Sequence, residues 1–191
     1  ISDMCEKFSI PRQNVSVTGF YRNNLFLQIT PATTSEKKHR LLQRILEAAH
    51  APTIVYVTLQ KTAEDVSDFL RENKIDAHPY HAGMENEMRE LIQNRFMEGA
   101  ISCVVATIAF GMGIDKRDIR RIIHFDLPKS IENYSQEIGR SGRDGKPALC
   151  EVLANRDHVH ILENFIYGDT PEKQSIVQLL KIIKENKGFV W

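Results

Sequence analysis

The stretch Thr53-Ile-Val-Tyr-Val57 indicates the fold of this chain. A short apolar, β-branched run of this kind is typical of a strand that is buried on both faces of a sheet. Amphipathic helices are predicted on either side of it, one capped by Thr34 or Ser35 and running to about Ala49, the other over residues 61–73. A strand between two helices is one unit of an alternating chain.

The alternation continues in both directions from this unit. Further strands are predicted at 25–29, 77–80, 102–106, 121–125 and 149–153, and further helices at 85–98, 130–138, 155–166 and 171–186. The apolar stripes expected to pack on the sheet are Leu41, Leu42, Ile45 and Leu46 in one helix, and Met88, Leu91, Ile92 and Phe96 in another. The pattern predicts an open parallel α/β sheet with helices on both faces and a short helical extension at the C-terminus.

Composition limits the classes of protein to consider. The chain has 191 residues, 42% hydrophobic and 26% charged, with a net charge of zero, as in an ordinary globular domain. No apolar run approaches the roughly 20 residues of a membrane span. Its three cysteines lie far apart, which favours a reducing compartment and predicts no zinc site. Contact with nucleic acid would need a local basic patch, for which the candidates are Lys116, Arg117, Arg120, Arg121, Arg140, Arg143 and Lys146.

Residues 134–145, Tyr-Ser-Gln-Glu-Ile-Gly-Arg-Ser-Gly-Arg-Asp-Gly, place two arginines three positions apart among glycines. Arg140 and Arg143 can then project from one side of a short helix end. Planar, permanently charged guanidinium groups suit the spread charge of a phosphoryl group. An exposed basic turn is the alternative, and spacing alone does not choose between the two.

Polar residues follow several predicted strands directly: Thr58, His81, Thr107, and the run Gly111-Met-Gly-Ile-Asp115. Open α/β sheets bind ligands at the carboxyl ends of their strands, and hydroxyl groups and glycine-flanked amides are good phosphate partners. The two threonines are equally compatible with strand-end caps, His81 with a structural histidine and Asp115 with a turn.

Other chemistries fit less well. A dinucleotide-binding fingerprint at 111–116 fails, because the third glycine and the distant acidic residue are missing. Glu137 and Asp144 are expected to pair with nearby arginines at the surface. No catalytic triad and no His/Cys metal set has suitable spacing in the sequence.

Taken together, the segments resemble the second RecA-like motor domain of superfamily-two helicases, and the RecQ family of DNA helicases in particular. Residues 53–60 are similar to motif IV, Tyr80-His-Ala-Gly-Met84 to a Y-H-A-G-L/M element, residues 104–116 to motif V and residues 136–145 to motif VI. Phe20-Tyr-Arg-Asn-Asn-Leu25 is similar to the family's F-x-R-x-N-L linker. Two departures are the absence of a G-x-x-x-x-G-K-[ST] loop with its acidic partner segment, and of a four-cysteine zinc module.

The resemblance implies a domain organisation and an activity. Residues 1–24 would be the tail of a first motor domain and the linker, 25–166 the second RecA-like domain, and 167–191 a helical linker to a further domain. The full-length protein would be a monomeric ATP-dependent DNA helicase, active on single-stranded and duplex DNA with 3'-5' polarity. A cytoplasmic, nucleoid-associated bacterial protein without a membrane segment is expected. This chain alone is expected to lack ATPase activity, because the first motor domain would hold most of the contacts to ATP and Mg²⁺.

The resemblance also implies residue roles. Arg143 would be the arginine finger and Arg140 its support, while Gln136, Gly113 and Asp115 would lie at the nucleotide. Thr58, His81 and Thr107 would hold the single-stranded DNA backbone. Two alternatives stay open, a non-catalytic nucleic-acid-binding module and an RNA helicase of the same superfamily.

Overall fold

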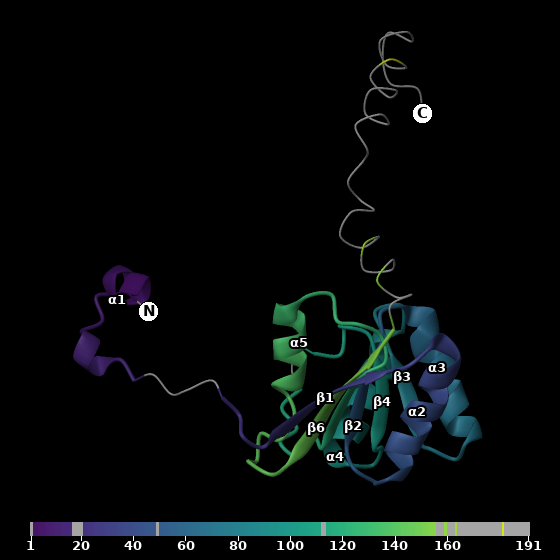
Figure 1. Cartoon of the computed structure of the whole chain (residues 1–191). Helices are drawn as coiled ribbons and strands as arrows, with labels where there is room; N and C mark the ends of the chain where they lie inside the picture. Colours follow the sequence, from purple (N-terminus) through teal and green to yellow (C-terminus); the bar gives the residue numbers. More distant parts are fainter. Residues whose placement is uncertain are drawn as a thin grey trace.

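One parallel sheet organises the chain. The computed structural model describes residues 2–16, 21–48, 50–111 and 114–155, with residues 159, 163 and 181. Within these ranges six strands form a single sheet in the order β1-β6-β5-β2-β4-β3, and all five pairings are parallel. The strands are β1 (Leu25–Pro31), β2 (Thr53–Tyr56), β3 (Ala77–Tyr80), β4 (Cys103–Ala106), β5 (Arg121–His124) and β6 (Ala148–Ala154). Figure 1 gives their arrangement.

The helices alternate with these strands as the sequence predicts. They are α1 (Ser2–Lys7), the short 3-10 helix η1 (Arg12–Asn14), α2 (Thr34–Leu46), α3 (Gln60–Glu72), α4 (Asn86–Glu98) and α5 (Ile131–Ile138). The predicted open α/β sheet is confirmed. One cap is corrected, because α2 begins after Thr33, whose backbone N–H donates to Glu36 Oε2 at 2.9 Å in a capping box. The helices predicted at 155–166 and 171–186 lie outside the described residues.

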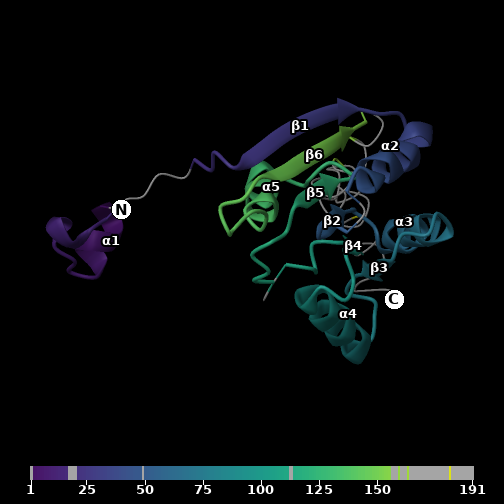
Figure 2. The same cartoon turned by 90° about the horizontal axis from the view of Figure 1, so that it is seen from below.

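Helices cover both faces of the sheet (Figure 2). On one face, α2 and α3 pack against the strands through residues that include Leu41, Val66 and Leu70. On the other face, α4 packs through Ile92 and Phe96. The central strands β2, β4 and β5 are buried along their whole length, as expected of a parallel sheet enclosed on both sides.

The apolar stripe predicted on two of the helices, α2 and α4, includes residues that the structure leaves partly exposed. Leu46, Met88 and Leu91 are each about half exposed, whereas Leu41 and Ile45 of α2 are buried. A helix touches a flat sheet along a narrow ridge, so positions four residues apart are enclosed and their neighbours along the helix remain at the surface. The expectation that all of these residues pack on the sheet is therefore wrong for Leu46, Met88 and Leu91.

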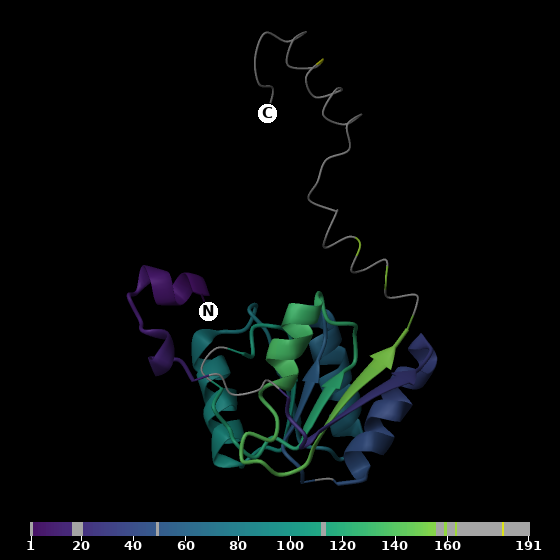
Figure 3. The same ribbon diagram turned by 60° about the vertical axis from the view of Figure 1, so that its left-hand side comes forward.

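The common strand direction separates two ends of the domain. All the strands run the same way, so their carboxyl ends meet at one edge of the sheet (Figure 3). The first and last strands, distant in sequence, lie side by side and pair over seven residues, from Leu25 with Ala148 to Pro31 with Ala154. After β5 the chain enters α5, which runs back toward the amino end of the sheet. The bond that shows this joins the N–H of Gly142, beyond α5, to the carbonyl of Ile119, just before β5.

Candidate functional site

Three of the predicted site residues lie together at the carboxyl ends of adjacent strands. Thr58 follows β2, Thr107 follows β4 and His81 follows β3, and these strands are neighbours in the sheet. The Thr107 N–H donates to the carbonyl of Tyr80 at 3.1 Å, which fixes the end of β4 against that of β3. We call these three residues the carboxyl rim.

Thr58 is held by a buried charge pair that the sequence reading missed. Its backbone N–H donates to Asp126 Oδ2 at 2.9 Å. On the other side of this carboxylate, Lys37 Nζ lies 3.6 Å from Asp126 Oδ1 and is fully buried. Lys37 also donates to the carbonyl of Phe125. Burial lowers the pKa of the Lys37 ammonium, and the charge of Asp126 opposes this shift.

His81 is the most enclosed of the three rim residues. Its ring is buried, and Nε2 lies 3.3 Å from Glu64 Oε1. Neither ring nitrogen makes a hydrogen bond to another described residue. Among the described residues its polar neighbour is therefore the exposed carboxylate of Glu64, and little of the His81 surface faces solvent.

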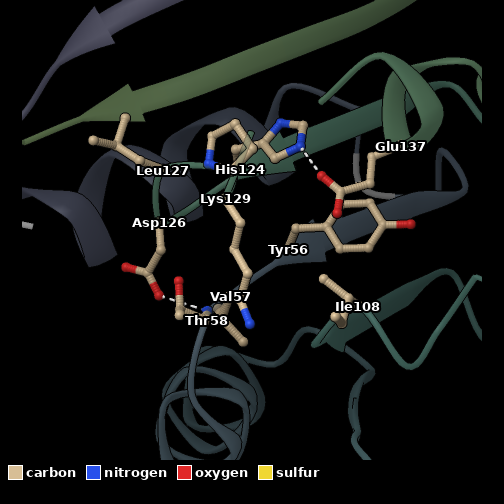
Figure 4. Close-up of a pocket in the computed structure, with 10 residues that line it drawn as sticks. Tyr56, Val57, Thr58, Ile108, His124, Asp126, Leu127, Lys129 and Glu137 are labelled. Carbon is tan, nitrogen blue, oxygen red and sulfur yellow. Dashed lines mark hydrogen bonds and ion pairs between the residues drawn. The ribbon is translucent and has the colours of Figure 1, made fainter. Parts of the chain in front are cut away.

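A pocket opens beside Thr58 (Figure 4). Ile108 and Lys129 line it, and a buried pair in which His124 Nε2 lies 2.7 Å from Glu137 Oε2 forms part of its wall. Glu137 was expected to pair with an arginine at the surface, and this expectation is wrong. Residue 137 lies on the buried face of α5, and there it pairs with His124 of β5.

The two arginines of residues 134–145 do not lie at the carboxyl rim. They belong to the segment 139–147 between α5 and β6, which we call the arginine loop. Arg140 donates to the carbonyl of Gly111. A Cβ at Gly111 would stand 2.7 Å from Arg140 Nη2, so the guanidinium passes directly over this glycine. The expectation that all ligand-binding groups gather at the strand ends is therefore incomplete, because the arginine loop is bound through Gly142 to Ile119, ahead of β5.

Arg143 is the more accessible of the two arginines. Its side chain is 35% exposed, and Nη1 donates to Asp115 Oδ1 at 2.7 Å. Asp115 is itself 71% exposed. The structure thus brings together Arg143, Asp115 and Arg140 around the connection from β4 to β5. Gln136 lies on the exposed side of α5, and Gly113 is outside the described residues.

The basic patch predicted from sequence is not one surface. Arg121 is buried and donates to the carbonyl of Ile45 at the end of α2, because alternation along β5 sends its side chain to the α2 side. Lys116 is largely buried and pairs with Asp118. Asp144, expected to pair with a nearby arginine, does so with Arg120. The exposed part of the patch is therefore narrower than predicted.

The described residues offer no alternative site for a metal ion, since no group of three His, Cys, Asp or Glu side chains converges among them. No helix in the described part of the chain has the length and apolar character needed to span a bilayer.

Comparisons with known proteins agree with this geometry. The helicase conserved C-terminal domain model matches residues 36–145. The bifunctional 3'-5' exonuclease/ATP-dependent helicase WRN of Mus musculus is 35% identical over 190 residues, which cover 97% of this chain and 14% of that protein. The ATP-dependent DNA helicase RecQ of Bacillus subtilis is 33% identical over 184 residues, covering 96% of this chain and 30% of that protein. The chain thus spans less than a third of either relative.

A solved structure supports the fold. The E. coli DEAD-box protein SrmB, crystallised with the regulator of ribonuclease activity A, superposes with a TM-score of 0.65 over 80% of this chain and 89% of its own, at 24% identity. This likeness confirms the RecA-like architecture, and the family match extends over more than half of the residues. The chain therefore belongs to the helicase conserved C-terminal domain family and, within it, is similar to the RecQ helicases.

Proposed function

We propose that this chain is the second motor domain of an ATP-dependent DNA helicase of the RecQ type. Residues 25–166 would form the domain, 1–24 the end of a first motor domain and its linker, and 167–191 a helical connection onward. The names of the two curated relatives support ATP-dependent helicase activity for the full-length protein. Such an enzyme would unwind duplex DNA in the 3'-5' direction during repair and recombination, at the nucleoid in a bacterial cell, and would act as a monomer.

The observation that carries the proposal is the position of Arg143. Its guanidinium is partly exposed in the middle of the arginine loop, and its polar contacts among the described residues are Asp115 and two backbone carbonyls. An exposed ion pair costs little to break. Arg143 can therefore leave Asp115 for the γ-phosphate of an ATP bound by the first motor domain, and stabilise the charge that develops during phosphoryl transfer.

The neighbouring residues would have supporting roles. Arg140, turned toward Gly111, would fix the connection after β4. Asp115 and Gly113 would line the side of the nucleotide pocket that this domain supplies, and Gln136 would relay the state of the nucleotide. Guanidinium groups fit a phosphate ligand, while Mg²⁺ prefers oxygen ligands that the first domain would provide. ATP is thus the substrate shared by two domains, and this chain alone would not hydrolyse it.

The carboxyl rim would hold the single-stranded DNA. The hydroxyl groups of Thr58 and Thr107 stand at neighbouring strand ends and can donate to phosphate oxygens, which are the commonest polar contacts that proteins make to nucleic acid. His81 would act from beneath them. Opening and closing of the cleft between the two motor domains would then move the two DNA contacts relative to each other.

Replacement of Arg143 tests the nucleotide role. In the full-length protein, Arg143→Ala should lower the ATP turnover number on the order of 10³-fold, about 4 kcal/mol, because the finger stabilises only the transition state. DNA binding and thermal stability should be nearly unchanged. Arg95→Ala, which removes an exposed arginine of α4, is the matched control. Unchanged turnover in Arg143→Ala would rule out the assignment.

A second measurement tests the nucleic acid. Thr107→Ala should reduce DNA-stimulated hydrolysis more than basal hydrolysis, and an equal loss of both would contradict a strand-holding role. Stimulation by single-stranded RNA should be weaker than by DNA of the same sequence. Stronger stimulation by RNA would favour an RNA helicase, and no stimulation by either would favour a non-catalytic binding module.

A further inference from the structure

Two side chains from a short segment ahead of the sheet bind the backbone of the arginine loop. This linker segment, Tyr21–Asn24, precedes the arginine loop by more than a hundred residues in sequence. Arg22 Nη2 donates to the carbonyl of Gly142 at 2.6 Å and to that of Ser141 at 3.1 Å. Arg22 Nε donates to Asn24 Oδ1 at 3.2 Å, which orients the asparagine. A charged donor bound to two consecutive carbonyls fixes the direction of that peptide segment.

Asn24 binds the backbone of the same loop. Its Nδ2 donates to the carbonyl of Gly142 at 2.8 Å and to that of Lys146 at 2.9 Å. Its own backbone carbonyl accepts from the N–H of Ala148, the first residue of β6, at 2.9 Å. The side-chain amide therefore bridges both ends of the turn 142–146, and the backbone joins that turn to the sheet.

Gly142 fits this arrangement closely. It has a φ of +56°, and a Cβ there would stand 2.5 Å from Asn24 Nδ2 and 2.9 Å from the carbonyl oxygen of Lys146. The absence of a side chain is what lets the asparagine reach the loop backbone. The linker segment therefore packs directly against the loop backbone at Gly142. The next residue in the loop is Arg143.

We infer that Arg22 and Asn24 are positioning residues that set the orientation of Arg143, and so couple the arginine finger to the linker between the two motor domains. The inference rests on the proposed function of Arg143. Every polar contact of Arg22 and Asn24 described above goes to the arginine loop, to β6 or to each other, so a displacement of the linker displaces the loop backbone. A misplacement of about 1 Å at a catalytic group costs on the order of 10²-fold in rate.

The sharpest variant is Asn24→Asp, because it keeps the shape of the side chain and replaces a donor by a carboxylate oxygen facing two carbonyls. In the full-length helicase, kcat for ATP hydrolysis should fall by about tenfold to a hundredfold, while the single-stranded DNA concentration that gives half-maximal stimulation changes less than about twofold. Asn23→Asp introduces the same charge at the exposed neighbouring residue and should leave both quantities unchanged.

Two further variants separate positioning from a purely structural role. Arg22→Lys keeps the charge but cannot place two donors in the same fork, so it should lower kcat less than Arg22→Ala does. Adding Arg143→Ala to Asn24→Asp should cost no more than Arg143→Ala alone, because the asparagine acts through that arginine. Melting temperatures measured alongside identify any variant that loses activity only by unfolding.

The outcomes are distinguishable. If Arg143→Ala abolishes turnover and Asn24→Asp and Arg22→Ala leave kcat unchanged in folded protein, the positioning role is wrong and the proposed function stands. If kcat and the DNA response fall together in proportion to lost folded protein, the contacts are structural only, and the inference is again overturned. If Arg143→Ala itself retains turnover, the proposed function fails first.

Discussion

At the carboxyl rim Thr58 is fixed by the buried core, whereas the arginine loop that carries Arg143 is fixed in part by the segment Tyr21–Asn24 ahead of the sheet. The rim residue is bound through its backbone to Asp126, which pairs with the fully buried Lys37. The loop is bound through its backbone to Arg22 and Asn24, and its terminal guanidinium pairs with an exposed carboxylate. Thr58 is therefore fixed by the core, whereas the loop is fixed both by the domain, through the bond from the Gly142 N–H to the carbonyl of Ile119, and by the segment Tyr21–Asn24, so a displacement of that segment acts on the loop.

Under the proposed function, the carboxyl rim and the arginine loop would have different tasks, and the difference in their support fits those tasks. A contact that must keep its grip on a phosphate backbone gains from a rigid support, because preorganisation reduces the cost of ordering groups on binding. If Arg143 is the proposed arginine finger, it engages and releases with each ATP and needs a support that can change with domain position. Each prediction below challenges one side of this comparison.

The largest expected effect comes from removing the support of the rim. Asp126→Ala should lower the free energy of unfolding by about 3–5 kcal/mol, because it leaves the Lys37 charge buried without its carboxylate. Urea denaturation measures this, with Asp68→Ala as the control, since Asp68 pairs with Arg71 at the surface. A loss no larger than that of the control would mean that the rim is not held by this pair.

An intermediate effect, on the rate of ATP hydrolysis, is expected from a substitution at Gly111, over which the Arg140 guanidinium passes. In Gly111→Ala the new methyl group would stand 2.7 Å from Arg140 Nη2 and displace the guanidinium. We expect kcat for ATP hydrolysis in the full-length protein to fall by about tenfold, about 1.4 kcal/mol, with little change in DNA affinity. In an Arg140→Ala background the same substitution should add nothing. Additive losses would show that residue 111 acts independently of the arginine.

The smallest effect is expected at the exposed ion pair. Asp115→Asn removes the charge that holds Arg143, and the free energy of unfolding should change by no more than about 1 kcal/mol, because exposed pairs contribute little. Addition of salt should reduce even that difference. Thermal unfolding at low and high ionic strength measures it. A loss of several kcal/mol would make the arginine loop as firmly fixed as the rim and remove the contrast.

The sequence was sufficient to predict the strands and helices and their order, because the apolar residues of buried strands and of amphipathic helices recur with different periods. It was also sufficient to bring Thr58, His81 and Thr107 to one edge, since parallel strands end on the same side. Motif spacing grouped Arg140 and Arg143, but it did not show that their loop is bound ahead of β5, because that depends on the path of α5.

Burial of charged residues was the main failure. Lys37, Arg121 and Glu137 were not expected in the core, because each is paired with a group far away in sequence. A signal for Lys37 existed, since it precedes Leu41 and Ile45 at intervals of four residues and shares their buried helix face. For Arg22 and Asn24 the resemblance to the F-x-R-x-N-L linker marked the two residues but not their partners, because the partners are backbone carbonyls, which every residue carries.

The parallel pairing of the first and last strands has a mechanical consequence. Because β1 and β6 lie in register over seven residue pairs, a pull applied before Leu25 and after Ala154 acts along the ladder. Every hydrogen bond between the two strands then bears part of the load in shear, and none can be opened singly by peeling. Under the proposed function, in which the domain would be pulled through both of its connections as it moves along DNA, this ladder would reinforce the domain along the line of tension.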